Sequence, residues 1–292
     1  MNNDEILQMI DSSNFPVGMG GYDSDEFDTE CEIYNITIFD GTNSSNEIIQ
    51  NKSKIFKIHH ENLSEIYPEN LINFLNLQII RDDEWELKMF LSQIEAKKYS
   101  LFSRCAKNAL VDSQFALSKA KNSIEYNDPF ASCWIKSATI SLIDSVLLQN
   151  QILPTPSKSL SSMRNLKEKN TNQFVDKIIS ETGIERATIS LLTRMLKSSI
   201  GFLDMIEQNK ISITIEKKAN YLIQNSLLSD CYLYLLYQNR NNFYKIKDSL
   251  NKNSDKIHVL KTAFDLSNDL SASSQSIDSL SKITNSLLHN VL

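Results

Sequence analysis

Glycine and acidic residues near the start of the chain are spaced in a way that could support chemistry on a nucleotide. Four of the six glycines lie within the first 41 residues. Gly20 and Gly21 precede an acidic run, 23–32, that ends with Glu30 and Glu32. Glycine lets a phosphate approach the backbone closely, and carboxylates hold Mg²⁺ together with substrate phosphates. Gly20-Gly21 is therefore a candidate phosphate-binding turn, and the two glutamates are candidate metal ligands.

The apolar segment that follows the acidic run predicts a β-strand over Ile33–Phe39. Side chains of a strand alternate between its two faces. We therefore expect Tyr34, Ile36 and Ile38 to face the core, and Asn35 and Thr37 to face a cleft below the glycine turn.

The same alternation constrains the two glutamates. A strand that runs unbroken from Glu30 places Glu30 and Glu32 on the core face, with Ile36 and Ile38. A bulge between Glu32 and Tyr34 would shift this phase. Catalytic carboxylates belong on the polar face, so the unbroken strand argues against a metal site at the glutamates.

This order of features resembles the opening of the minimal nucleotidyltransferase family. In that family an apolar residue and a Gly-Gly or Gly-Ser pair lead into a strand that carries alternating acids, as Met19-Gly20-Gly21 does here. One alignment matches the acids to Glu30 and Glu32. The other places Ile33 and Asn35 where the acids belong. The resemblance implies transfer of a nucleoside monophosphate with Mg²⁺ as cofactor.

The third acid of the family is also missing from its expected place. A second strand is predicted over Lys54–His59, and Lys57 and His59 stand where the acid is expected; Asp40 and Glu61 are the nearest acids and fall at strand ends. We therefore expect a degenerate site with no confident catalytic residue. The expected nucleotide-binding residues are Gly20, Gly21, Asn35 and Lys57, and Glu30 and Glu32 are expected metal ligands only in the alternative register.

Two functions remain open from the sequence. The first is a pseudoenzyme that keeps the nucleotidyltransferase-like fold and binds a nucleotide or a protein partner. The alternative is an active magnesium-dependent nucleotidyltransferase that modifies a small molecule or a protein. The strand-phase argument favours the first.

The pattern changes near residue 82 from β-like alternation to helical periodicity. We predict an α+β protein with a small mixed-sheet domain, 1–82, followed by a larger all-helical bundle, 83–292. Its layout around Arg164 is similar to helical domains of the HEPN type, which are often fused to nucleotidyltransferase sheets. HEPN ribonucleases carry an Arg followed closely by His, and this chain lacks that pair, so ribonuclease activity is not expected.

Several helical details can be predicted within the second part. Trp85, Met89, Phe90 and Ile94 are expected to form the buried stripe of its first helix. A single helix is expected over about 219–237. The polar cluster 239–242 then reads as the end of that helix.

Composition limits the remaining possibilities. The chain has 292 residues, a formal net charge of −6 and a pI of about 5.4, which argues against a nucleic-acid partner. No apolar run reaches the length of a membrane span, and the N-terminal sequence lacks the basic region of a signal peptide. The four cysteines are widely spaced and are expected to be reduced core thiols of a cytoplasmic protein.

Overall fold

The computed structural model describes residues 6–7, 10, 14–22, 24, 26–42, 47–167, 172–206, 211–250, 256–266 and 270–291. The chain divides into two compact units, Met1–Leu101 and Phe102–Leu292. The first holds a mixed sheet and the second is helical, so the α+β class is confirmed.

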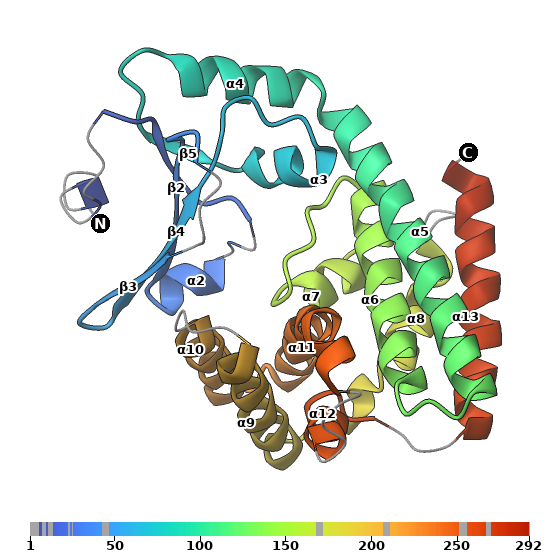
Figure 1. Cartoon of the computed structure of the whole chain (residues 1–292). Helices are drawn as coiled ribbons and strands as arrows, with labels where there is room; N and C mark the ends of the chain where they lie inside the picture. The colour runs from blue at the N-terminus through green and yellow to red at the C-terminus, as the bar shows by residue number, and fades with distance from the viewer. Residues whose placement is uncertain are drawn as a thin grey trace. The chain divides into compact units, whose positions relative to one another are not determined.

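The sheet of the first unit has five strands in the order β3-β4-β2-β1-β5 (Figure 1). Strands β2 and β4 are parallel, and the other neighbours are antiparallel. The strands are β1 (Val17–Met19), β2 (Ile33–Ile38), β3 (Glu47–Asn51), β4 (Lys54–His60) and β5 (Gln78–Arg81). The strands predicted over Ile33–Phe39 and Lys54–His59 correspond to β2 and β4, whereas β1 and β3 were missed. Both missed strands are short, and β1 contains a glycine.

Each face of the sheet lies under its own apolar cluster. Ile36 and Ile38 pack with Phe56 and Ile58 on one face, as predicted from the alternation of β2. Phe39 packs with Phe74 and Leu77 in the second cluster. Because both faces are covered, Asn35 and Thr37 are buried, with exposed fractions of 2% and 0%, and do not face an open cleft.

The helices of the first unit extend its core beyond the sheet. They are α2 (Glu26–Glu30), α3 (Pro68–Leu71) with a 3₁₀ turn η1 (Ile72–Phe74), and α4 (Glu86–Ala96). Helix α4 buries Leu87, Phe90 and Ile94 in the same cluster as Phe74, which is why this unit continues past the expected boundary at residue 82. The predicted stripe is wrong at Trp85 and Met89, which are 61% and 58% exposed.

The second unit is a bundle around α6 (Ala131–Gln149), in which most residues are buried (Figure 1). The other helices are α5 (Lys98–Glu125), α7 (Ser159–Arg164), α8 (Val175–Glu181), η3 (Ile184–Arg186), α9 (Ile189–Ile206), α10 (Ile211–Gln224), α11 (Leu228–Leu250), α12 (Ile257–Ala263) and α13 (Leu270–Val291). Helices α7, α8, α11 and α13 pack against α6, while α9 packs against α10, α11 and α12.

Two details of the predicted helices are wrong. The helix expected over 219–237 is two helices, because the chain turns at Ser226, which has a left-handed φ of 61°. The polar cluster 239–242 lies inside α11 and does not end it. Its Arg240 is held by an ion pair with Asp144 on α6, a tertiary contact that local sequence does not reveal.

Helix α6 corrects the expectation that no apolar run reaches the length of a membrane span. Among the described residues it is the one helix long and apolar enough to cross a bilayer, with a mean hydropathy of 1.3. In the structure 89% of that stretch is buried inside the protein. Burial on all sides explains its composition, because a central bundle helix is hydrophobic all round.

Candidate functional site

The glycine turn is shaped by a close approach of two backbone segments. Gly20 and Gly21 have φ values of 96° and 75°. The N–H of Gly20 donates to Asn35 O at 2.9 Å, and the N–H of Tyr22 donates to Asn73 O at 3.1 Å. A Cβ on Gly21 would lie 2.7 Å from Asn73 O. The turn therefore has a structural reason for glycine, and its outer two N–H groups are already hydrogen-bonded within the protein.

The two glutamates lie outside β2. Glu30 is the last residue of α2 and is exposed, and Glu32 has a left-handed φ of 52° just before the strand. The strand is therefore not continuous with Glu30, and the alternation argument does not apply to these carboxylates. Across the described residues, no three His, Cys, Asp or Glu side chains gather closely enough to hold a metal ion. The assignment of Glu30 and Glu32 as metal ligands stays a prediction.

Below the turn, Tyr22 and His59 form a stacked pair. Their ring centroids lie 4.1 Å apart with an interplanar angle of 14°. His59 Nε2 lies 3.4 Å from Asn35 Oδ1. The register of β2 and β4 pairs Asn35 with Lys57 and Thr37 with His59, so these four residues share one face of the sheet.

The charge of this cluster is controlled by burial. Burial, followed by the nearby charges of Lys57 and His60, lowers the pKa of His59 to about 3. Burial also raises the pKa of Tyr22 well above its usual range, and the adjacent Glu61 adds to the effect. Both rings are therefore neutral near pH 7, and Lys57, which is partly exposed, is the cation of this face.

The acids closest to the predicted third position already have partners. Asp40 Oδ2 accepts a hydrogen bond from His60 Nδ1 at 2.6 Å, and its Oδ1 accepts from Thr42. Burial raises the pKa of Asp40, but these hydrogen bonds outweigh it and the net pKa is lowered. Glu61 accepts a hydrogen bond from the Tyr22 hydroxyl, and burial raises its pKa. Because both carboxylates are already hydrogen-bonded, neither is counted among the residues of the polar cluster around Lys57.

His59 makes the stability of the first unit depend on pH. Its folded pKa lies below its unfolded value, so unfolding takes up a proton at low pH and its stabilising contribution is lost as pH falls from about 6.5 toward 3. We expect a loss of about 2 kcal/mol between pH 7 and pH 5. A His59→Gln variant should lose less stability over this range.

The measurement is hydrogen exchange of peptides from β2 and β4 at pH 7 and pH 5, corrected for intrinsic exchange. His258→Gln is the matched control, since His258 is exposed on α12 in the other unit. An equal pH response in the wild type and in His59→Gln would show that His59 is not the responsible group.

The helical unit contains polar clusters that the sequence analysis missed. The two charged residues of α6, Lys136 and Asp144, each join one. Lys136 Nζ donates to Thr182 O and lies 3.2 Å from the hydroxyl of Tyr232. Burial, with a smaller effect of Arg186, lowers the pKa of Lys136 to about 8. A lone cation within the apolar run of α6 was the available signal, because such a residue needs an internal partner.

The structure thus defines an α+β protein with a neutral-to-cationic polar cluster on its sheet. No family model and no curated protein matches the chain. Among solved structures, the chain is similar to a nucleotidyltransferase-like protein from Exiguobacterium sibiricum 255-15, with a TM-score of 0.31 and 9% identity over 77% of this chain and 91% of that one. A likeness of this size carries no argument about activity, so the proposals below rest on the residues.

Proposed function

We propose that this is a nucleotidyltransferase-like protein whose transfer site is degenerate and which acts by binding a nucleotide or a protein partner. The main observation that supports this proposal is the register of β2 and β4. It gathers Asn35, Thr37, Lys57 and His59 on one face, where two-metal transfer requires carboxylates. An amide, a hydroxyl, an amine and a neutral imidazole supply no hard anionic oxygen for Mg²⁺.

A nucleotide would be held at the edge of this face by Lys57, which is partly exposed, because Asn35, Thr37 and His59 are buried. Lys57 supplies a positive charge for a phosphate, and buried Asn35 fixes the turn by accepting the N–H of Gly20 at its carbonyl. Because the N–H of Gly20 is used in this way, Gly21 is the member of the predicted phosphate-binding pair that would contact a phosphate. Without metal, charge stabilisation of a transferring group is lost, and that stabilisation dominates catalysis of this type.

The alternative, an active magnesium-dependent enzyme, is favoured by one observation. Glu30 and Glu32 lie in a helix end and a left-handed turn, not on the core face of an uninterrupted strand. The alternation of side chains along a strand, which argued against these carboxylates as metal ligands, therefore does not apply to them. A test of activity must include these two residues.

The helical unit and the cellular setting complete the proposal. We propose that the helical unit has a HEPN-like layout, that the protein has a protein partner and that it is located in the cytoplasm. All four cysteines are buried and none of them forms a disulfide, which is compatible with a reducing compartment.

Pyrophosphate release tests the proposal. The protein is incubated with the four nucleoside triphosphates and Mg²⁺, and we expect no release above the rate without protein, because the described residues form no carboxylate cluster to hold the Mg²⁺ that neutralises the triphosphate. The double variant Glu30→Gln, Glu32→Gln is compared with Glu47→Gln, Glu84→Gln, which removes two exposed carboxylates from the same unit. Release that persists in the second variant and disappears in the first would establish the active alternative.

A further inference from the structure

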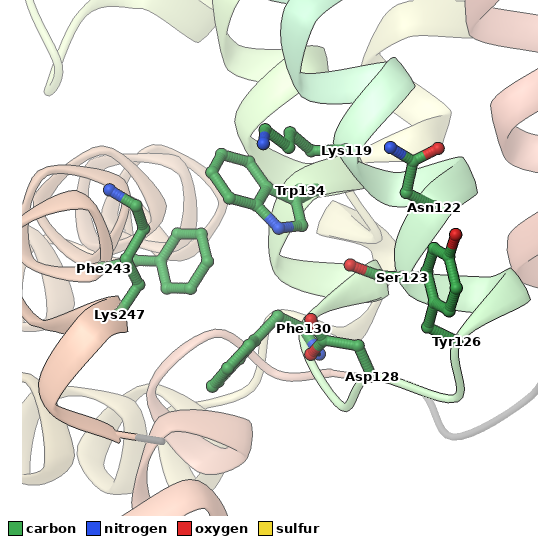
Figure 2. A pocket seen from close by; sticks show the side chains of 9 residues that line it. All are labelled: Lys119, Asn122, Ser123, Tyr126, Asp128, Phe130, Trp134, Phe243 and Lys247. Atoms are coloured by element: carbon green, nitrogen blue, oxygen red, sulfur yellow. The ribbon is translucent and has the colours of Figure 1, made fainter. Parts of the chain in front are cut away.

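A hollow of about 350 Å³ opens in the helical unit between α5, the start of α6 and α11 (Figure 2). Phe130, Trp134 and Phe243 form its apolar wall, and Lys119 and Lys247 lie at its edges. This volume is at the lower end of the range for small-molecule sites. An occupant is therefore of about the size of one or two fused rings with a polar substituent.

The apolar wall is rigid. Trp134 and Phe243 meet edge to face with centroids 4.9 Å apart, and Phe130 and Phe243 lie 5.7 Å apart. Phe130 and Trp134 are 4% and 6% exposed and pack on fully buried Phe243, so the edges that these two rings offer are held in place before any ligand arrives. Figure 2 shows the indole nitrogen of Trp134 and the hydroxyl of Ser123 on the sides that face the hollow. A planar ring can therefore find both apolar contact and polar anchors here.

The charges around the hollow favour an anion. Lys119 Nζ lies 5.4 Å from the ring of Phe115, and Lys247 Nζ lies 3.4 Å from the carbonyl of Tyr244. The positive end of α6, which begins at Ala131, lies at this hollow, but the negative ends of α5 and α11 lie there as well, so the helix dipoles do not add to the two cations. Asp128 opposes them, and its carboxylate is partly engaged by the N–H of Phe130 at 2.9 Å. Two ammonium groups and one carboxylate leave the lining of the hollow with a net positive charge.

We propose that this pocket binds a small aromatic anion, with the ring against Phe130 and Trp134 and the acidic group between Lys119 and Lys247. The proposal concerns the helical unit alone and does not rest on the function proposed for the sheet. A carboxylate and a phosphate share the required chemistry, and the experiment separates them.

The two tryptophans of the chain make the pocket directly observable. In protein labelled with ¹⁵N-tryptophan, the indole signals of Trp85 and Trp134 are assigned with a Trp85→Phe variant. Indole-3-acetate is titrated as the carboxylate probe and adenosine 5′-monophosphate as the phosphate probe. We expect at least one of them to shift the Trp134 signal in a saturable way while the Trp85 signal stays in place. Which one binds more tightly identifies the acidic group.

Charge variants and neutral analogues test the role of the cations. Indole-3-acetamide and adenosine should bind about tenfold more weakly than the matching anion. Lys119→Gln and Lys247→Gln should each weaken the anion about threefold, and Lys121→Gln, an exposed change on α5 outside the pocket, should not. Asp128→Asn should tighten binding, a gain that a purely structural role of Asp128 would not produce.

Two results would overturn the proposal. One is a Trp134 signal that neither anion shifts at millimolar concentration in protein with a wild-type circular dichroism spectrum. The other is a neutral analogue that binds as tightly as its anion, which would remove the assigned role of the lysines.

Discussion

Replacing Asp144 by Ala is expected to lower the free energy of unfolding of the helical unit by about 3 kcal/mol. Asp144 Oδ2 pairs with Arg240 at 2.9 Å, and Asp144 Oδ1 accepts a hydrogen bond from Tyr237 at 2.5 Å. The two charged side chains are each only 17% exposed. Removing the carboxylate leaves a guanidinium and a hydroxyl largely away from water, and this loss of partners is the source of the cost.

Urea denaturation followed by Trp134 fluorescence in a Trp85→Phe background reports on the helical unit. Asp278→Ala is the control, because Asp278 is exposed on α13 of the same unit and its replacement should cost less than about 0.5 kcal/mol. Adding Arg240→Met to Asp144→Ala should recover part of the stability, since no unpaired charge then remains. A cost for Asp144→Ala no larger than that of the control would refute the buried network.

Gly21→Ala is expected to destabilise the first unit by about 3 kcal/mol, from a left-handed backbone and a collision with backbone. The new Cβ would lie 2.7 Å from Asn73 O, which is fixed in the 3₁₀ turn η1. Gly41 is the matched control because it has the same φ of 75° but nothing within 4 Å of its Cβ position. Gly41→Ala should therefore cost about 1 kcal/mol, the backbone contribution alone.

Hydrogen exchange of peptides from β2, measured by mass spectrometry, gives the opening free energy of the sheet in both variants. The difference between them isolates the close approach of the turn to η1. Equal costs would mean that this approach does not constrain Gly21, and would leave phosphate binding as the reason for the glycine.

Much of the fold follows from local sequence. Regular alternation predicted β2, and the change to helical periodicity near residue 82 matches the helices that begin with α4. The missed elements depended on distant partners. β3 carries no buried residue of its own and is held by β4, and α2 occupies an acidic run with little apolar pattern. Such segments are defined by tertiary contacts, which one sequence does not display.

The candidate site was harder to anticipate than the fold. The family resemblance singled out Asn35 and Lys57, and the register of β2 and β4 places both residues on one face. The sequence did not show that Tyr22 would stack on His59, because their contact joins a turn to a strand far along the chain. The pocket beside Trp134 was also missed, since its walls come from three separate helices.

The central claim is that the sheet lacks metal-supported triphosphate chemistry, and calorimetric titration with ATP tests it most directly. The titration is run with Mg²⁺ and again with EDTA, on the wild type, on Lys57→Ala and on Glu30→Gln, Glu32→Gln. We predict that Mg²⁺ changes the affinity by less than about twofold, that Lys57→Ala weakens it, and that the glutamate variant matches the wild type. Binding that requires Mg²⁺ and is lost in the glutamate variant would contradict the claim.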